Sequence, residues 1–283
     1  MNEIQVITLD DPRYPNALRD LKDAPKQLYA KGNLNLLDRP MVSIVGTRDC
    51  TRYGLMVAKD IAAQCVAAGF VVVSGLAEGI DTAAHQGAKN ATIAVLGNGL
   101  EVYYPAINKD LQDEIGLCGL LISEYPPSLH GTKTTFPQRN RIVAALGQAV
   151  IAVEADLRSG TLITVKMANA LHRAVYAVPG NINCYASQGT NTLIANGQAK
   201  MVTSVSDLIE QLTGTIATTA VVQKKQISLE HQAVLNILKS DEVHFDDLVM
   251  ESGLAVSQLS TLLTNMEMIG LIEKLPGNYF VAK

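Results

Sequence analysis

The chain of 283 residues has no tryptophan, only four phenylalanines and no apolar run that could cross a membrane. A membrane helix needs about 18 consecutive apolar residues. The first residues also lack the basic and apolar segments of a signal peptide. We therefore expect a cytoplasmic protein. Phe70, Phe245 and Phe280 lie in apolar segments, so Phe136 is the phenylalanine with polar neighbours.

Further absences exclude several classes of site. The four cysteines are widely spaced and form no Cys-x-x-Cys pair, which argues against a zinc site or a disulfide framework. The Gly-x4-Gly-Lys-Ser/Thr motif of nucleoside triphosphatases does not occur. Gly97-Asn98-Gly99 is followed by Tyr-Tyr-Pro rather than by a helix start, which disfavours a dinucleotide site. We expect neither a metal nor a cofactor.

Six short, nearly all-apolar runs rich in β-branched residues are typical of strands that are buried on both faces. They are residues 41–45, 70–73, 92–96, 119–123, 149–153 and 174–178. Helical segments occupy most of the gaps between them and the region that follows, namely 54–68, 80–89, 138–146, 160–172, 192–197 and 205–212, with a small strand at 199–202. This alternation predicts an α/β fold with a doubly wound, mostly parallel sheet.

The pattern divides the chain into four parts. Residues 1–38 form a lead-in, irregular or helical over Pro12 to Leu37, that packs on a large α/β domain at 39–212. Residues 213–227 are small and polar and read as a linker. Residues 228–283 predict helices at 229–239, 245–252 and 257–270, then a hairpin around Pro276-Gly277-Asn278, which is the pattern of a winged helix.

The charge is unevenly distributed between these parts. The chain has a formal charge of −4 from 23 bases and 27 acids, and residues 228–283 hold three of the bases and eight of the acids, or −5. Residues 1–227 therefore carry a net charge of +1. Any affinity for phosphate has to come from local clusters of Lys and Arg side chains. The third helix of the winged helix has no Lys or Arg, which favours a structural or protein-contact role over reading of a DNA groove.

Three turns that can bind anions follow predicted strands. They are Gly46-Thr47-Arg48, Ser74-Gly75 and Arg158-Ser159-Gly160-Thr161. Ligands of such sheets bind beyond the carboxyl ends of the strands, so the turns should converge on one edge, where backbone N–H groups and Arg48 face a phosphate. Each glycine taken singly is explained as well by a tight turn. Together with nearby cations the turns predict a phosphate site.

Residues 132–145 place the ring of Phe136 among Lys133, Arg139 and Arg141, beside Asn140. Cations that follow phosphates and a ring that stacks on a base are the chemistry of a site for single-stranded nucleic acid. Phosphate contacts of Arg48, Lys133 and Arg139 predict that log affinity falls with log salt at a slope of about −2 per protomer. The alternative is a surface loop whose ring fills the core and whose arginines are solvated.

Several motifs in their order and spacing resemble the DNA-processing protein A (DprA, also called Smf) family along most of the first 200 residues. They are Gly-Thr-Arg (46–48), Ser-Gly-Leu-Ala-Glu-Gly-Ile-Asp (74–81), Gly-Asn-Gly-Leu-Glu-Val-Tyr-Tyr-Pro (97–105), Ser-Glu-Tyr-Pro-Pro (123–127), Phe-Pro-Gln-Arg-Asn-Arg (136–141), Arg-Ser-Gly-Thr (158–161) and Val-Pro-Gly-Asn (178–181). The resemblance implies an extended Rossmann-like fold and binding of single-stranded DNA.

The resemblance also implies a homodimer that acts in natural transformation. In this role the protein loads the recombinase RecA on incoming strands, with single-strand binding protein as a further partner. The family pattern puts a phosphate-binding Arg at Arg48, a Lys at Lys133 and the ring at Phe136. Roles of the helical domain that many family members carry ahead of the Rossmann part are not transferred to this chain.

We thus expect a nucleic-acid site without catalytic residues. Its members are Gly46, Thr47, Arg48, Ser74, Gly75, Lys133, Phe136, Arg139, Asn140, Arg141, Ser159, Gly160 and Thr161. The apolar segment from Leu193 to Leu212 is a candidate for the dimer or partner contact.

An alternative class is a Rossmann-type hydrolase of nucleoside monophosphates, similar to the lysine-decarboxylase-like phosphoribohydrolases. Its candidate acids and base are Glu78, Asp81, His85, Glu101, Glu124 and Glu154. Asp81 and His85 lie four residues apart on one helix face, but we favour Asp81 as a helix cap and His85 as a locally packed residue. The Pro-Gly-Gly-x-Gly-Thr signature of that group is absent. A ligand-sensing winged-helix repressor, a third alternative, is disfavoured by the acidic third helix.

Overall fold

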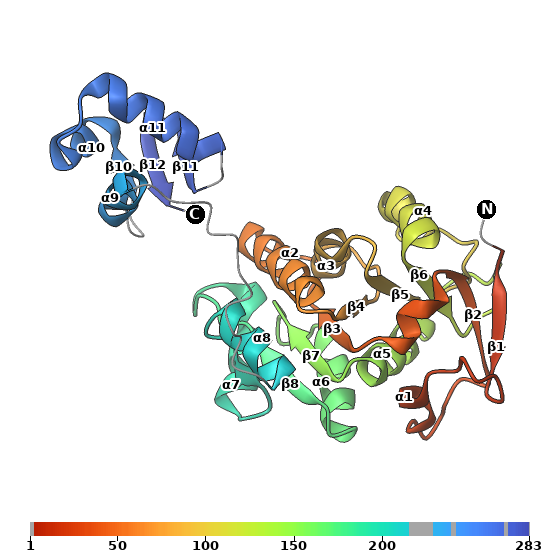
Figure 1. Ribbon diagram of the computed structural model, residues 1–283. Helices are drawn as coiled ribbons and strands as arrows, with labels where there is room; N and C mark the ends of the chain where they lie inside the picture. The colour runs from red at the N-terminus through yellow and green to blue at the C-terminus, as the bar shows by residue number, and fades with distance from the viewer. Residues whose placement is uncertain (1–2, 215–228, 239–241, 269–270, 283) are drawn as a thin grey trace. The chain divides into compact units, whose positions relative to one another are not determined.

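The structure is a computed structural model that describes residues 3–214, 229–238, 242–268 and 271–282 (Figure 1). The chain divides into two compact units, residues 1–217 and 218–283, each with a hydrophobic core of its own. Most of the linker expected at 213–227 lies outside the described residues. We describe the two units separately.

The first unit is built on a nine-stranded sheet. Its strands are β1 (Gln5–Thr8), β2 (Gln27–Gly32), β3 (Met41–Val45), β4 (Val71–Ser74), β5 (Thr92–Leu96), β6 (Leu120–Ser123), β7 (Ala149–Ala152), β8 (Ala174–Ala177) and β9 (Lys200–Met201). The order across the sheet is β1-β2-β6-β5-β4-β3-β7-β8-β9. The strands from β6 to β9 are parallel, whereas β2 is antiparallel to both β1 and β6. The predicted doubly wound, mostly parallel sheet is confirmed.

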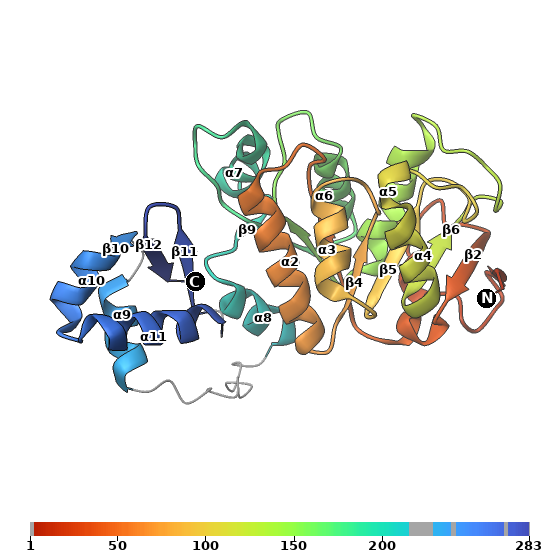
Figure 2. The same ribbon diagram turned by 90° about the horizontal axis from the view of Figure 1, so that it is seen from above.

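Helices cover both faces of the sheet (Figure 2). They are α1 (Asn16–Arg19), α2 (Arg52–Ala67), α3 (Ile80–Ala88), α4 (Lys109–Cys118), α5 (Thr135–Leu146), α6 (Thr161–Ala170), α7 (Gln188–Ala195) and α8 (Val205–Thr213). Side chains of β4 alternate between two cores, because successive residues of a strand point to opposite faces. Val71 and Val73 pack on the face of α5 and α6, and Val72 packs on the face of α2 and α3.

The lead-in and one helix differ from the sequence prediction. The expectation of an irregular or helical lead-in holds for α1 and for a 3-10 helix at Leu34–Asp38, but it is wrong for Gln27–Gly32, because β2 and β1 extend the sheet at the free edge of β6. Tyr14 is buried, and its hydroxyl donates to the carbonyl oxygen of Pro25, 2.8 Å away. This contact joins residues that are eleven positions apart, so short-range patterns did not show it. The amphipathic helix α4 was also missed, since its sequence KDLQDEIGLC has few apolar residues.

The strand order reverses its direction between β3 and β7. From β3 the chain winds through β4 and β5 to β6, and then returns to place β7 on the other side of β3. Such a switch point leaves a crevice beyond the carboxyl ends of the two strands, where ligands of open α/β sheets bind. The turn after β3 contains Gly46-Thr47-Arg48, and the segment after β7 leads to Ser159-Gly160-Thr161.

The described residues of the second unit form three helices and a three-stranded sheet. The elements are α9 (Leu229–Leu238), β10 (Val243–His244), α10 (Phe245–Ser252), α11 (Val256–Met268), β11 (Ile272–Leu275) and β12 (Tyr279–Ala282), with the strand order β10-β12-β11. Gly277 and Asn278 both have positive φ, as a tight hairpin turn between β11 and β12 requires. The predicted winged helix is confirmed.

Candidate functional site

A cavity of about 320 Å³ lies at the switch point between β3 and β7. All three predicted turns contribute to its lining. The residues that they supply are Gly46, Thr47, Arg48, Gly75, Ser159, Gly160 and Thr161, and α5 adds Phe136, Arg139 and Asn140. The tertiary structure thus brings together most of the site predicted from the sequence.

Three exposed cations stand in or beside the segments that form the cavity. Arg48 lines the cavity itself, Arg158 belongs to its third turn, and Lys133 precedes α5 without reaching the cavity wall. In the described part of the chain, none of these three side chains forms a hydrogen bond or an ion pair. Their charges are therefore available to an anionic ligand.

Four backbone amides of the turns have acceptors within the protein, which contradicts the prediction that they face a ligand. The N–H group of Thr47 donates to the carbonyl oxygen of Glu154, and that of Gly75 donates to the carboxylate of Asp81. The N–H groups of Ser159 and Thr161 are satisfied by Asp156 and by the Ser159 hydroxyl. The amides of Gly75, Ser159 and Thr161 bond within their own loops, and that of Thr47 bonds to the neighbouring segment after β7, because a turn that approaches a core must satisfy its buried donors.

Ser74, another expected member of the site, is also used internally. The side chain is fully buried, and its hydroxyl donates to the carbonyl oxygen of Ile44 at 2.7 Å. The bond links the ends of β4 and β3 and leaves the hydroxyl without access to a ligand. Ser74 is therefore a structural residue of the sheet edge, which corrects the prediction.

Arg139 is likewise a structural residue rather than an exposed cation. It is 5% exposed and donates to the carbonyl oxygens of Gly75 and Val95. Burial lowers the pKa of its guanidinium, whereas the nearby Asp81 carboxylate raises it. The prediction of a direct phosphate contact failed because both acceptors lie far from Arg139 in the chain. What Arg139 can supply is a fixed positive charge beneath the cavity.

Asp81 is the buried counter-charge of Arg139. Its carboxylate accepts hydrogen bonds from the N–H groups of Gly75 and Ala77. Burial raises the pKa of Asp81, and the charge of Arg139 opposes this shift. The N-cap residue of α3 is Gly79, and Asp81 lies two residues later, in the first turn of the helix. The prediction that Asp81 caps α3 is therefore wrong. Asp81 instead shapes the loop between β4 and α3.

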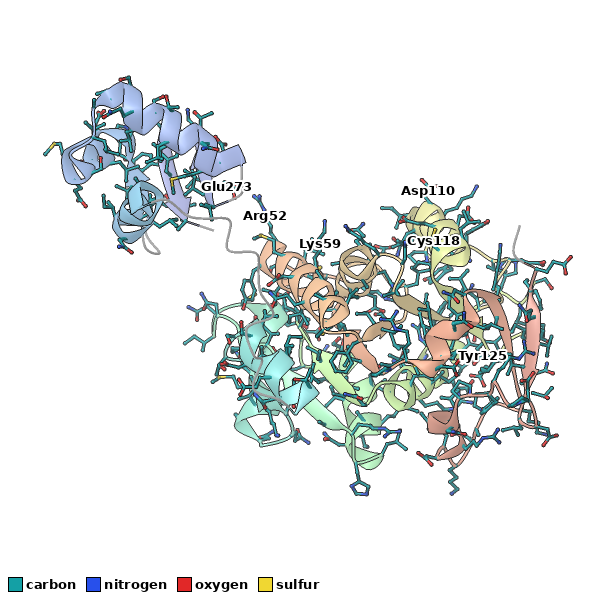
Figure 3. The ribbon with its side chains drawn as sticks, in the orientation of Figure 1. Arg52, Lys59, Asp110, Cys118, Tyr125 and Glu273 are labelled. Atoms are coloured by element: carbon teal, nitrogen blue, oxygen red, sulfur yellow. The ribbon has the colours of Figure 1, made fainter. Side chains whose placement is uncertain are left out.

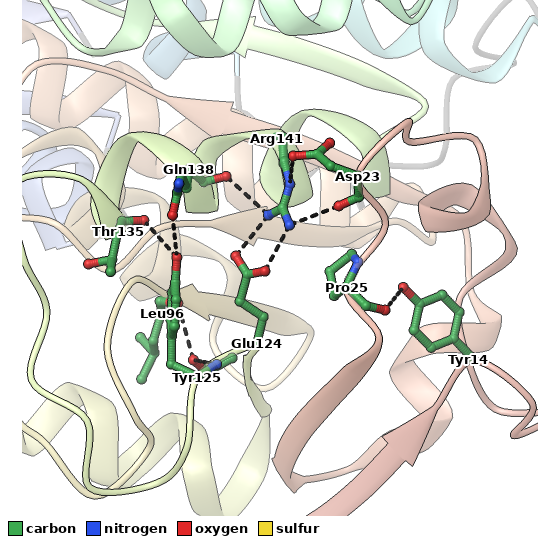
Figure 4. Close-up of polar contacts among 10 residues, drawn as sticks. Tyr14, Asp23, Pro25, Leu96, Glu124, Tyr125, Thr135, Gln138 and Arg141 are labelled. Carbon is green, nitrogen blue, oxygen red and sulfur yellow. Dashed lines mark hydrogen bonds and ion pairs between the residues drawn. The ribbon is translucent and has the colours of Figure 1, made fainter.

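Arg141 also lies outside the predicted site, and Figure 4 shows its contacts with Glu124 and Asp23. Its guanidinium forms a bidentate ion pair with Glu124, with distances of 2.8 and 2.7 Å, and its Nε donates to Asp23 at 2.8 Å. Burial lowers the pKa of Arg141, but the hydrogen bonds and charges of Glu124 and Asp23 outweigh it and raise the pKa overall. Arg141 thus joins α5 to the end of β6 and to the lead-in, which satisfies its donors.

Phe136 is half-buried at the border of the cavity and stacks on Tyr104, with ring centroids 4.9 Å apart. Gly97 and Gly131 leave room for the ring, since a Cβ atom at either position would lie 2.5 Å from it. Tyr104 is 47% exposed and lines a smaller hollow that continues from the cavity. The aromatic surface is therefore a pair of rings. Tyr104 is not among the residues predicted for the site, although its Tyr-Tyr-Pro motif was a visible signal.

The acids of the alternative hydrolase are dispersed. Glu124 pairs with Arg141, and Glu154 accepts hydrogen bonds from the amide and hydroxyl of Thr51. Glu78 and Glu101 are exposed, and neither belongs to the cavity at the switch point. Of the candidate acids only Asp81 lines that cavity, where two amides and Arg139 already engage it.

His85 is buried, as expected for a packed histidine. Its Nδ1 lies 2.7 Å from the hydroxyl of Thr92, which itself donates to the carbonyl oxygen of Val72. Because the hydroxyl hydrogen is used in this way, Nδ1 carries the imidazole proton. Burial, with a smaller effect of the Arg139 charge, lowers the pKa of His85 to about 3. The residue is neutral at pH 7.

Within the described ranges, no group of three or more His, Cys, Asp or Glu side chains is arranged to hold a metal ion. No helix in these ranges is both long and apolar enough to span a membrane. The first unit thus combines its sheet with a cavity that the free Arg48 and the ring of Phe136 line, and Tyr104 stacks on that ring in the adjoining hollow.

The fold and the cavity define a Rossmann-like α/β protein whose cavity beyond β3 and β7 presents the free cation Arg48. A winged helix follows this part of the chain. Residues 5–213 match the model of the family described as DNA recombination-mediator protein A. Residues 219–278 match the DprA winged helix domain. The chain belongs to the DNA recombination-mediator protein A family and is a DNA-processing protein of that family.

Characterised relatives agree with this assignment. The chain is 47% identical over 204 residues to the DNA processing protein DprA of Streptococcus pneumoniae. The aligned region covers 71% of this chain and 72% of that protein. It is 33% identical over 314 residues to protein Smf of Synechocystis. The aligned region covers 96% of this chain and 79% of the Synechocystis protein.

Two solved structures are similar to the first unit. The X-ray structure of S. pneumoniae DNA processing protein A has a TM-score of 0.70 and 44% identity, and the match covers 74% of each chain. A structure of the Helicobacter pylori protein, described for its single-stranded DNA binding mode, has a TM-score of 0.69 and 36% identity. That match covers 76% of this chain and 99% of the H. pylori chain.

Proposed function

We propose that this protein binds single-stranded DNA at the switch-point cavity without making or breaking a bond. The observation that carries the proposal is the position of the free Arg48 in a cavity that Phe136 borders and Tyr104 extends. An unpaired strand offers phosphates and base faces side by side. Cations beside aromatic rings match both, and they do so without reading sequence.

The expected site residues act in three ways under this proposal. Arg48 and Lys133 contact phosphates, and Arg158 is a further exposed cation of the third turn. The buried charge of Arg139 raises the local potential without direct contact, since a low-dielectric surrounding screens it weakly. Gly46, Thr47, Asn140, Ser159, Gly160 and Thr161 line the cavity and allow the strand to approach.

The rings supply the base contact. Phe136 stacks on Tyr104, so a base would stack on the exposed Tyr104 or on the part of Phe136 that faces the cavity. A stack of this kind contributes about 1–3 kcal/mol per base. The description of the H. pylori relative by its single-stranded DNA binding mode supports the same ligand.

In the cell we propose a role as a recombination mediator in natural transformation. The protein would bring RecA onto incoming single strands in the cytoplasm, in the presence of single-strand binding protein, and would act as a homodimer. The family description as a recombination mediator supports the role. Two sites on one strand gain affinity through effective concentration, which gives a dimer a physical advantage. Leu193 and Leu208 pack in the core, so they are not the surface of such a dimer.

We further propose that the protein is not an enzyme. A glycosidic hydrolase needs an acid that is free to protonate or to activate water within reach of the substrate. The carboxylate of Asp81, which lines the cavity, instead faces two backbone amides and Arg139. Incubation with nucleoside monophosphates should release no free base.

Fluorescence anisotropy with a labelled poly-pyrimidine oligonucleotide tests the site. Arg48→Ala and Phe136→Ala should each weaken binding about fivefold or more, whereas Lys22→Ala, at an exposed position of the lead-in, serves as a matched charge control. Unchanged affinity in both site variants would refute the assignment. The mediator role is tested by RecA filament formation on strands covered by single-strand binding protein, which the wild type should accelerate.

A further inference from the structure

A second hollow opens from Arg48 on the face of α2 and α3. Its walls are Leu55, Met56 and Lys59 of α2 and Thr82, Ala83 and Gln86 of α3, with Ile107 from the turn before α4 at one end. We name it the α2–α3 groove. Arg48 also lines the cavity at the switch point, so the two depressions are continuous at that side chain.

Two cations lie along the exposed face of α2: Lys59 lines the groove, and Arg52 lies on the same helix beyond the lining. Arg52 and Lys59 are seven residues apart, and both are exposed on α2, where Figure 3 labels them. A rise of 1.5 Å per residue separates them by about 10 Å along the helix, a length comparable with a few nucleotides. Neither side chain forms an ion pair or a side-chain hydrogen bond among the described residues.

Opposing charge in the groove is small. Glu78 is the acidic residue of its lining. Asp60, which follows Lys59 in the chain, is engaged by the side-chain amide of Gln64. Among the lining residues, Arg48 and Lys59 outnumber Glu78, so the lining carries a net positive charge that attracts a polyanion.

Apolar side chains lie between these cations. Met56 is 61% exposed and Ile107 is 79% exposed, and Leu55 is also accessible. Arg52, Leu55, Met56 and Lys59 share one helix face, since residues three and four apart are neighbours. Cations interleaved with exposed apolar groups match a polynucleotide, in which charged phosphates alternate with bases that are poorly solvated on their faces.

We propose that the α2–α3 groove is a second subsite for the same single strand. The strand passes Arg48, leaves the cavity and continues along α2, where Arg52 and Lys59 neutralise phosphates and Met56 and Ile107 contact bases. This inference rests on the proposed function and adds a path and a length dependence to it. Short strands fill the cavity alone, and longer strands also occupy the groove.

The test compares oligothymidines of about 6 and about 20 nucleotides, within and beyond the span of one nucleic-acid site. The variant Arg52→Ala/Lys59→Ala should bind the longer strand about tenfold more weakly and the shorter strand as the wild type does. Its slope of log affinity against log salt for the longer strand should become shallower by about 1.4, or about 0.7 for each lost contact. Met56→Ser should weaken only the longer strand.

Controls separate the possible failures. Lys22→Ala removes one positive charge from an exposed position of the lead-in and should change neither affinity. Circular dichroism verifies that the exposed α2 substitutions leave the fold intact, and light scattering verifies that they leave the oligomeric state unchanged.

Three outcomes would overturn the inference while leaving the proposed function standing. The first is equal behaviour of the wild type and the double variant on both strands. The second is equal weakening of both strands, which would indicate bulk charge instead of a path. The third is loss of a protein contact, such as RecA, with strand affinity unchanged. Failure of the wild type to bind either strand would instead refute the proposed function.

Discussion

The guanidinium of Arg139 donates to the carbonyl oxygen of Gly75, and a Cβ atom at position 75 would lie 2.6 Å from that guanidinium. Only glycine therefore fits at the end of β4 while Arg139 is in place. The contact links α5 to the loop that precedes α3, across 64 residues of sequence. It places a positive charge beneath the cavity and fixes the loop that forms one of its walls.

Loss of this contact should reduce stability. Arg139→Ala leaves the Asp81 carboxylate buried without its counter-charge, and removal of one partner of a buried pair typically costs about 3–5 kcal/mol. Gly75→Ala forces the guanidinium to move and should cost about 1–3 kcal/mol. Urea unfolding at pH 7 measures both. A stable Arg139→Ala protein whose DNA binding has a shallower salt slope would show Arg139 to be a phosphate ligand after all.

The salt dependence of DNA binding should reflect the cations that remain free. With Arg139 and Arg141 engaged internally, Arg48 and Lys133 predict a slope near −1.4 for a short strand, about −0.7 for each contact. Arg48→Ala and Lys133→Ala should each reduce the slope by about 0.7. Titrations at several salt concentrations provide the slopes, and a wild-type slope near zero would contradict the phosphate contacts.

The stacked rings should contribute to binding without contributing to its salt slope. Tyr104→Ala and Phe136→Ala should each weaken binding by about 1–3 kcal/mol, because a base loses its stacking surface. Tyr104→Phe is the matched control, since it keeps the ring and should bind nearly as the wild type does. Strand binding is measured by anisotropy. Normal affinity of Tyr104→Ala would show that bases do not stack there.

The ion pair of Arg141 should matter for stability and not for DNA. The side chains of Arg141 and Glu124 are 11% and 16% exposed, and Glu124→Gln leaves the guanidinium with a weaker partner. We expect a loss of about 2–4 kcal/mol in the free energy of unfolding. Strand affinity should stay within about twofold of the wild type. A selective loss of binding in a fully folded variant would place Arg141 in the DNA site.

Acid should destabilise the protein partly through His85. Its pKa is lowered from 6.5 to about 3 in the folded state, so the unfolded state binds more protons between these values. The stability contributed by the neutral imidazole is complete above pH 6.5 and is lost as the pH falls toward 3. Two pH units below 6.5, the loss is about 2–3 kcal/mol.

Comparison with His85→Gln isolates this effect. Glutamine retains a donor for Thr92 and does not titrate, so its urea midpoint should fall less steeply between pH 7 and pH 4.5. Carboxylates elsewhere act equally in both proteins and cancel in the difference. Identical pH profiles would mean that His85 is solvated or already protonated in the folded state.

Much of the fold was predictable because its signals are local. The strands β3 and β5 have the predicted bounds, 41–45 and 92–96, since fully buried parallel strands appear as continuous apolar runs. β2 was missed because its residues QLYAKG are half-polar and pair at the antiparallel side of the sheet. Only its pairing with β6 makes it a strand.

The candidate site was predicted in place but not in detail. The three turns met at one cavity because the carboxyl ends of parallel strands share an edge of the sheet. The hydrogen-bond acceptors of their backbone N–H groups could not be predicted from the sequence. The acceptor for Thr47 is the carbonyl oxygen of Glu154, which lies in the neighbouring segment after β7.

The sequence by itself determined the alternation of strands and helices, the glycine turns at the strand ends and the winged helix, because local propensity and apolar periodicity specify them. The tertiary structure decided which of Arg48, Arg139 and Arg141 faces solvent. Arg139 and Arg141 found acceptors at Val95, Gly75, Glu124 and Asp23, which are between 17 and 118 residues away in the chain. A buried charge must be paired, and its partner is chosen by proximity in space, which residue order does not reveal.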